Sequence, residues 1–256
     1  MADSPAFDPP VALASLSGEA DAEWAQQGAE YAGAAFLGGI ALDEQTRAAA
    51  QEMVDRDRTE FLPSDPIAFI DDQLAALSDL SLTPGFNVRT TSLEPLARAA
   101  AVCADHDAII EINAHCRQDE MCAAGAGESL LRNEDRLCEQ VRTAAESGAA
   151  VSVKVRTELD GVSLPALAPE LDAAGADYLH VDAMDSEPVI ADIAEETTAT
   201  IIANNEVRDR ESVAEYLSYG ADAVSVGRPS DDPRVLSRVR DAAESWFADE
   251  PMEVDL

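Results

Sequence analysis

Lysine is nearly missing from this chain. Of its 256 residues, 51 are Asp or Glu and 17 are Lys or Arg, and Lys154 is the only lysine, so that the formal net charge is −34. The acids are spread along the chain between apolar periodic stretches, a pattern that argues against a disordered acidic segment. Molar salt shortens the Debye length to about 3 Å and screens repulsion among so many carboxylates. The composition therefore predicts a folded, halophilic, cytoplasmic protein.

Paired cysteines, long apolar runs and basic patches are also missing. The four cysteines include no Cys-x-x-Cys pair, so we expect neither a disulfide framework nor a metal site. The opening "MADSPAFDPP" has neither the basic nor the apolar part of a secretory leader, and no apolar run is long enough to span a membrane. Without a basic patch the usual attraction to nucleic-acid phosphates is absent. We expect no membrane and no DNA partner.

A helical stretch, a glycine followed by alanine, and a short β-rich run recur in this order. They are found in "AAESGAAVSVKV", "LDAAGADYLHVDAM" and "EYLSYGADAVSVGR", where Gly148, Gly175 and Gly220 stand where helix ends adopt left-handed geometry. The β-rich runs are almost continuously apolar, which is typical of parallel strands covered on both faces. The pattern predicts consecutive βα units.

Eight such strands can be placed, which is the number in a (β/α)8 TIM barrel. The competing architecture, an open doubly wound sheet, would carry a Gly-x-Gly-x-x-Gly turn after its first strand, and this chain has none. We expect an N-terminal extension over 1–10, a single α/β barrel over 11–245 and an acidic tail over 246–256. Two helices are expected in the long gap between residues 42 and 83. The expected strands are Val11–Leu16, Ala35–Ala41, Gly85–Thr90, Ala108–Asn113, Ala150–Arg156, Asp177–Ala183, Thr200–Asn204 and Ala223–Gly227.

The expected strand "VSVKVR" has two cationic side chains near its C-terminal end. In a (β/α)8 barrel the active site lies at the C-terminal ends of the strands. Alternation places Ser152, Lys154 and Arg156 on the inward face and the three valines on the outward face. Inward cations lose hydration, so they need an anion or an electron-rich ligand. An internal salt bridge to Asp182 or Glu111 is the alternative to a ligand.

Two further strand ends carry candidate functional groups. In "EINAHC", Asn113 ends a strand, and Cys116 lies in the loop that follows, where it could donate or accept a proton or simply be a small buried side chain. After the last strand, Gly227 allows close backbone approach and Arg228 adds a cation, features that favour a phosphate site.

These segments together resemble the flavin-dependent tRNA-dihydrouridine synthase family and, more distantly, the dihydroorotate dehydrogenases. "NAHCR" and "GAGESLL" match the family's Asn-x-Gly-Cys-Pro and Gly-x-Gly-x-x-Leu-Leu segments at the family's spacing. "VKVR" and "GADAVSVGR" match its Val-Lys-x-Arg strand and its closing strand, and "LASLSGEAD" is similar to its first-strand segment. The similarity extends from about Val11 to Pro229.

The resemblance implies an FMN-dependent oxidoreductase that exchanges hydride at flavin N5 with a C=C bond of a uracil-like or other heterocyclic substrate. By motif position, Lys154 would lie at the N1/O2 edge of the flavin, and Cys116 would donate the proton. Asn113, His115 and Arg156 would bind the substrate. The implied cofactor-binding residues are Ser15, Asn87, Lys154, His180, Asp182, Asn204, Gly227 and Arg228.

The sequence departs from the family at the phosphate end and at the C-terminus. Asp182 and Met184 replace a histidine and an arginine, and "NNE" at 204–206 replaces Asn-Gly-Asp. Added acids would weaken phosphate binding. Family members continue into a helical domain that grips tRNA, whereas this chain ends at Leu256. We therefore expect a small heterocyclic substrate rather than tRNA. The sequence gives no prediction of the oligomeric state.

Two other functions fit the same residues. A non-flavin lyase or isomerase barrel could use Lys154 to form a Schiff base, because a desolvated lysine beside Arg156 would have a lowered pKa. A degenerate barrel could bind a ligand without catalysis, which the altered phosphate segment favours.

Overall fold

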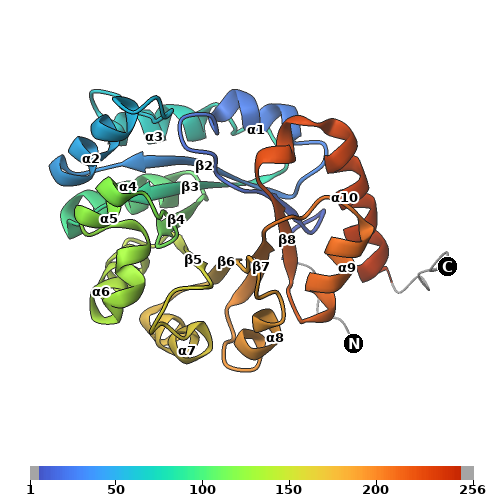
Figure 1. The fold of residues 1–256 in the computed structure, drawn as a ribbon. Coiled ribbons are helices and arrows are strands. Elements are labelled where there is room, and N and C mark those ends of the chain that lie inside the picture. Colours follow the sequence, from blue (N-terminus) through green and yellow to red (C-terminus); the bar gives the residue numbers. More distant parts are fainter. Residues whose placement is uncertain (1–5, 249–256) are drawn as a thin grey trace.

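Eight parallel strands close into a barrel in the order β1 to β8, with β8 paired to β1, and the helices surround it (Figure 1). This computed structural model describes residues 6–248. Residues 1–5 of the expected extension and residues 249–256 of the expected acidic tail lie outside the described residues. The predicted (β/α)8 TIM barrel is confirmed. The strands are β1 Val11–Leu13, β2 Ala34–Ala41, β3 Thr83–Arg89, β4 Ile109–Asn113, β5 Ala150–Arg156, β6 Tyr178–Asp182, β7 Thr200–Asn204 and β8 Ala223–Val226.

The helices fill the gaps as the sequence predicts, including two between β2 and β3. The helix α10 ends at Phe247, just beyond the expected barrel boundary at 245. None of the helices in the described part of the chain is long and apolar enough to cross a membrane. The α-helices are α1 Ala22–Gly28, α2 Glu44–Val54, α3 Pro66–Ala75, α4 Leu93–Asp105, α5 Asp119–Ala123, α6 Glu134–Ala145, α7 Leu164–Ala174, α8 Val189–Ala194, α9 Arg210–Ser218 and α10 Pro233–Phe247, and the 3-10 helices are η1 Gly127–Arg132 and η2 Arg228–Asp231.

The first strand is shorter than predicted. Its pairing with β2 and β8 stops at Leu13 rather than reaching Leu16. Ser15 therefore lies in the loop after β1, at the C-terminal mouth of the barrel. Left-handed geometry was predicted for the glycines between the end of a helix and the next strand. It is confirmed, because φ is +87° at Gly148, +106° at Gly175 and +96° at Gly220.

Many of the aspartates begin helices. The side chains of Asp21, Asp43, Asp65, Asp209 and Asp232 each accept a hydrogen bond from a backbone N–H in the first turn of the helix that follows. An aspartate at this position satisfies a free donor and interacts favourably with the helix dipole. Part of the chain's large negative charge therefore supports its helices directly.

The barrel interior changes from apolar to polar along its axis. An apolar cluster that includes Phe36, Ile109 and Ile202 fills the N-terminal side, and Phe7 packs against it and stacks on Tyr178 at a centroid distance of 5.7 Å. Further toward the C-terminal ends, the inward positions hold buried polar side chains. These polar side chains form the base of the site. The polar inward side chains are Asn87, Glu111, Ser152, Lys154, His180 and Ser225.

Candidate active site

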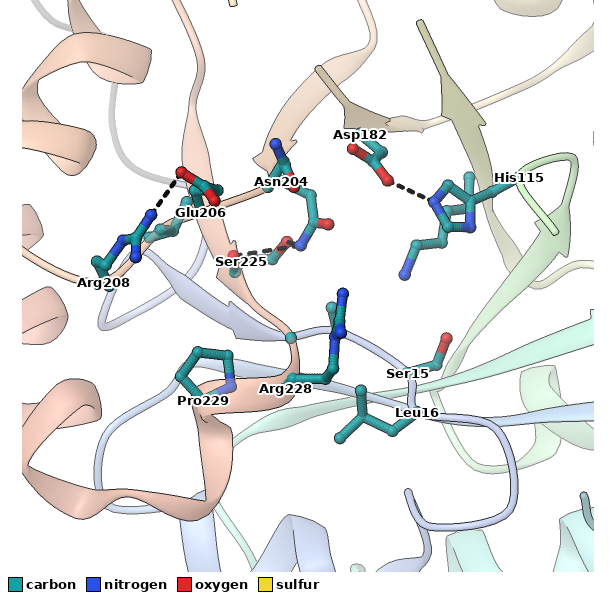
Figure 2. Close-up of a pocket in the computed structure, with 15 residues that line it drawn as sticks. Ser15, Leu16, His115, Asp182, Asn204, Glu206, Arg208, Ser225, Arg228 and Pro229 are labelled. Atoms are coloured by element: carbon teal, nitrogen blue, oxygen red, sulfur yellow. Dashed lines mark hydrogen bonds and ion pairs between the residues drawn. The ribbon is translucent and has the colours of Figure 1, made fainter. Parts of the chain in front are cut away.

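A cavity of about 500 Å³ opens at the C-terminal mouth of the barrel, over the ends of β1, β5, β6, β7 and β8 (Figure 2). Cofactor and ligand sites commonly occupy about 300–1,000 Å³. The strand ends that the sequence indicated are therefore the ones that enclose a cavity. Of the predicted site residues, Ser15, His115, Lys154, Asp182, Asn204, Gly227 and Arg228 line it.

Lys154 lies on β5, and its side chain reaches the cavity although the residue is only 4% exposed. Burial lowers the pKa of this amine, and the nearby carboxylates of Glu111 and Asp182 act in the opposite direction. Among the described residues, neither carboxylate comes within ion-pair distance of the amine. The internal salt bridge considered for Lys154 is thus not formed, and its ammonium is available to a bound group.

Arg156, two residues further along β5, is engaged differently. Its Nη1 lies 2.8 Å from Glu128 Oε2, and the backbone N–H of Glu128 donates to the Cys116 carbonyl at 2.9 Å. Gly127 presses against the same peptide: a Cβ on this glycine would lie 2.2 Å from the Cys116 oxygen, and its φ is +61°. The "GAGESLL" segment therefore holds the Cys116 loop in place.

Asn113 shapes the turn that follows β4. Its Oδ1 accepts from the backbone N–H of His115 at 3.2 Å and of Cys116 at 2.9 Å, while its Nδ2 donates to Asn87 Oδ1 at 2.8 Å. The turn directs His115 to the cavity wall. Cys116 does not line the cavity; it is half-buried against a cluster that includes Met121. The structure thus brings Asn113, His115 and Cys116 together but gives only His115 a surface on the cavity.

His115 and Asp182 form a pair on the cavity wall (Figure 2). Nε2 of His115 lies 2.5 Å from Oδ2 of Asp182, and the backbone N–H of Met184 also donates to this carboxylate at 3.3 Å. Although burial opposes it, these hydrogen bonds and the charge of Lys154 lower the pKa of Asp182. Asp182, which stands where the family has a histidine, is therefore ionised and paired with His115.

Below the cavity lies a continuous network of buried polar side chains. Glu111 accepts from Asn87 Nδ2 at 2.6 Å and from Ser152 at 3.1 Å, and it lies 2.7 Å from His180 Nδ1. His180 Nε2 is 2.8 Å from Ser225 Oγ. Asn87 and His180, both predicted to bind cofactor, are fully buried in this layer, beneath the cavity wall.

The loop after β7 replaces the expected glycine with asparagine but keeps a glycine-like backbone. Asn205 has φ +106° and Glu206 has φ +53°, in the region that favours glycine and, after it, asparagine. Tyr216 fixes the loop by donating to the carbonyls of Asn204 at 3.3 Å and Asn205 at 3.1 Å. Asn205, which stands where the family has glycine, therefore adopts a left-handed backbone conformation that glycine adopts readily.

Arg208 is a cavity residue that the sequence analysis missed. It lines the cavity with Arg228 and forms an ion pair with Glu206, which also lines it (Figure 2). Its position four residues after the end of β7, in a loop at the C-terminal mouth, could have indicated it. Each acid on the cavity wall, Asp182 and Glu206, thus has a basic partner.

A second missed group lies beside Cys116 at the end of β3. Arg89 forms an ion pair with Glu60, and its Nη2 donates to the Gly39 carbonyl at 2.6 Å. The Arg89 and Glu60 side chains are 1% and 0% exposed. Arg89 was part of an expected strand, but Glu60 comes from the loop between α2 and α3, so no local pattern predicted the pair.

One family model covers more than half of the chain. The family model described as dihydrouridine synthase (Dus) matches residues 86–254. An uncharacterized protein of Methanocaldococcus jannaschii is 29% identical over 236 residues, which cover 87% of this chain and 89% of the relative. The tRNA-dihydrouridine synthase B of Xanthomonas axonopodis pv. citri is 28% identical over 158 residues, 56% of this chain and 48% of that protein. This chain thus matches about half the length of the synthase.

Solved structures share the barrel. Morphinone reductase in complex with tetrahydroNAD superposes with a TM-score of 0.63 at 14% identity, covering 91% of this chain and 87% of that one. A mutant of FabK from Thermotoga maritima gives a TM-score of 0.59 at 14% identity, covering 88% and 63%. At this identity the likeness shows the fold alone.

Proposed function

The chain belongs to the dihydrouridine synthase family and is a flavin-dependent oxidoreductase, and from this premise we propose that its cofactor is FMN, bound in the cavity at the barrel mouth. The observation that carries the proposal is Lys154: the chain's only lysine reaches this cavity without an ion-pair partner among the described residues. A buried ammonium without a partner is costly unless a ligand compensates it.

The cavity residues fit the two ends of FMN. At one end, Arg228 and Arg208 supply cations for a phosphate, and the space beside Gly227 is open, with no atom within 4 Å of where its Cβ would be. Asn205 and Glu206 also line the cavity with positive φ, a backbone conformation in which successive N–H groups would face an anion. At the other end, Lys154 supplies a positive charge for the ring.

Lys154 would hold its charge beside the part of the ring that becomes negative on reduction. A bound flavin supplies hydride transfer at N5. With a flavin bound, the Lys154 ammonium would supply a fixed positive charge that favours reduction and needs no reorganisation during the reaction. A compact ammonium on an unbranched stem fits where a planar guanidinium would not, which gives a physical reason for the single lysine.

Cys116 would donate the proton to the carbon next to the one that exchanges hydride. The loop that carries it is fixed by Asn113, Gly127 and Glu128 and puts the neighbouring His115, but not the thiol itself, on the cavity wall, so the donation requires Cys116 to move toward the substrate. The substrate would be a small uracil-like or other heterocycle, bound by His115 on the cavity wall. A net charge of −34 disfavours tRNA, because backbone binding requires clustered cations.

The visible spectrum of the purified protein tests the cofactor. We expect flavin absorbance bands and release of FMN, identified by its mass, on denaturation. A colourless protein that does not quench the fluorescence of added FMN would overturn the proposal. If the protein is yellow, Cys116→Ala should keep the colour and lose turnover, whereas retained turnover would remove the cysteine from the mechanism.

A second candidate function uses Lys154 as a nucleophile. Burial lowers the pKa of its amine, which is what Schiff-base formation with a carbonyl substrate needs. Borohydride reduction in the presence of candidate aldehydes or ketones distinguishes the two. A covalent adduct on Lys154 supports the second candidate, and its absence in a yellow protein supports the first.

A further inference from the structure

Asn204 ends β7 with a side chain whose orientation is fixed by the next strand. It pairs in register with Ser225 of β8, and its Nδ2 donates to Ser225 Oγ at 2.6 Å and to the Ser225 backbone carbonyl at 3.3 Å. A carbonyl oxygen can only accept a hydrogen bond, so the part of the amide that faces it must be the nitrogen. The amide oxygen, Oδ1, therefore lies on the side away from Ser225, toward the cavity that Asn204 lines (Figure 2).

Ser225 and the backbone of Asn204 are themselves held in place. Ser225 is 1% exposed, and its Oγ lies 2.8 Å from His180 Nε2 in the buried polar layer. The Asn204 carbonyl accepts from the backbone N–H of Ala183 at 3.1 Å and from the Tyr216 hydroxyl at 3.3 Å. The position of the Asn204 acceptor is therefore set by the protein before a ligand binds.

Asp182 places a second acceptor beside Asn204. The two residues pair in register across β6 and β7, where neighbouring strands lie about 4.8 Å apart and paired side chains share a face. Oδ2 of Asp182 lies 2.5 Å from His115 Nε2, and Oδ1 accepts from the Met184 backbone N–H at 3.3 Å. A carboxylate accepts at about four positions, so Asp182 can still accept from a group in the cavity that it lines.

We propose that Asp182 and Asn204 form a hydroxyl-binding subsite, which takes a polyhydroxylated carbon chain of the ligand and not its phosphate. The inference rests on the proposed function, since FMN carries a hydroxylated ribityl chain between its ring and its phosphate. Hydroxyl groups donate hydrogen bonds that both side chains can accept, whereas a phosphate offers mainly acceptors and is repelled by the Asp182 carboxylate. The phosphate is then bound by Arg208 and Arg228, which follow β7 and β8.

This subsite gives the departure from the family at position 182 a function. An acid beside the phosphate would weaken binding of the ligand. An acid beside the hydroxylated chain strengthens it, because a hydrogen bond to a charged acceptor is stronger than one to a neutral acceptor. The subsite therefore predicts a preference for ligands that carry the chain over ligands that carry the ring alone.

Flavins that differ only in the chain attached to the ring test this preference. Riboflavin has the ribityl chain, lumiflavin has a methyl group in its place, and FMN adds the phosphate. The full-length protein, with any bound flavin removed by dialysis, is titrated with each flavin, and fluorescence quenching gives the Kd. Asn204→Leu removes one acceptor at similar side-chain size, Asp182→Asn removes the charge of the other, and Asp192→Asn at an exposed position of α8 is the control.

We expect Asn204→Leu and Asp182→Asn each to weaken riboflavin and FMN by the same factor, about three- to tenfold, which corresponds to one hydrogen bond. Lumiflavin affinity should stay within about twofold of the parent, since the ring makes no use of this hydrogen bond. All three affinities should be unchanged in Asp192→Asn. Circular dichroism spectra that match the parent's show that each variant is folded.

Three results of these titrations would overturn the subsite. The first is a parental riboflavin affinity in both variants. The second is an equal loss for lumiflavin, which would indicate a general disturbance of the cavity. The third is tighter FMN binding by Asp182→Asn, which would place the carboxylate at the phosphate.

Ring-free probes separate this inference from the proposed function. A protein that binds none of the flavins would overturn the flavin assignment, and the subsite is then tested by ligand-observed NMR with ribitol 5-phosphate and pentyl phosphate. Tighter binding of ribitol 5-phosphate that is lost in Asn204→Leu supports the subsite, whereas equal binding, or no binding of either, overturns it. A protein that binds FMN but does not prefer riboflavin to lumiflavin keeps its cofactor and loses the subsite.

Discussion

Glu111 Oε2 and His180 Nδ1 lie 2.7 Å apart, and both side chains are wholly buried beneath the cavity. Burial opposes ionisation of Glu111, but His180, Lys154 and the hydrogen bond from Asn87 lower its pKa to about 2. Burial is also the main cause that lowers the pKa of His180, while the charge of Glu111 acts against it. His180 Nε2 lies 2.8 Å from Ser225 Oγ. Together with Asn87, Ser152 and Ser225, the pair joins five strands of the barrel interior, β3 to β6 and β8, into one polar layer.

This pair should make the protein sensitive to acid. A carboxyl group whose pKa is lowered on folding contributes stability above its unfolded pKa and loses it as pH falls through the folded value. The Glu111 contribution of about 3 kcal/mol should therefore disappear between about pH 5 and pH 2. The lowered pKa of His180 acts in the same direction, since the unfolded chain gains a proton below about pH 6.5.

Urea unfolding of the parent and of Glu111→Gln at several pH values measures this effect. At pH 7 the variant should lose about 3 kcal/mol or more, because the remaining partners of a broken buried pair are left uncompensated. Its stability should then vary less with pH than that of the parent. Parallel pH profiles for the two proteins would contradict the assignment.

Replacing Lys154 should separate stability from chemistry. Lys154→Met removes a buried ammonium without an ion pair, so the free energy of unfolding should fall by no more than about 1 kcal/mol and could rise. Flavin-dependent turnover should fall by about 100-fold or more, in the range seen when one electrostatic group is removed from an active site. Lys154→Arg should also be impaired, because a guanidinium does not fit the same space. Paired urea melts and stopped-flow reduction kinetics check both parts.

Gly127→Ala should displace the Cys116 loop. The added Cβ would lie 2.2 Å from the Cys116 carbonyl oxygen, at a φ of +61°. We expect a loss of about 1–3 kcal/mol of stability together with loss of turnover. Gly161→Ala is the matched control: its φ is +79° and no atom lies within 4 Å of the new Cβ, so only the backbone strain is added. Equal effects of the two substitutions on turnover would argue against the contact.

Arg228→Gln should weaken FMN more than riboflavin, since only FMN carries the phosphate. Loss of a hydrogen bond to a charged group corresponds to about 1.5–3 kcal/mol, or about 10-fold or more in Kd. Riboflavin affinity should stay unchanged. Fluorescence titration of both flavins measures the difference, with Arg234→Gln as a control whose side chain is 84% exposed on α10. Equal losses for both flavins would place the phosphate elsewhere.

The barrel was predictable because its signals are local and repeated. Glycines at helix ends and apolar strands recur in each βα unit, and inward-outward alternation along β5 gave the orientation of Ser152 and Arg156. The exception is the first strand, where three paired residues were too few to define an end.

The location of a site residue was predictable only where it follows from the residue's position along its own strand. Lys154 and Gly227 stand at the cavity because they lie at or next to strand ends. Pairs such as Arg89 with Glu60, or Glu111 with His180, join residues that are 29 and 69 positions apart, so only the closed barrel brings them together. Asn87 and His180, which the resemblance placed at the cofactor, are fully buried in the polar layer and do not line the cavity.

The cavity wall carries three basic side chains, Lys154, Arg208 and Arg228, against the two acids Asp182 and Glu206, so it is locally positive in a molecule of net charge −34. An anionic cofactor is therefore repelled at long range and attracted only at contact. Added salt screens the distant carboxylates first, because the Debye length shrinks to about 8 Å at physiological ionic strength. For this protein the association rate of a phosphorylated ligand should rise with salt, the reverse of the usual behaviour at a basic phosphate site.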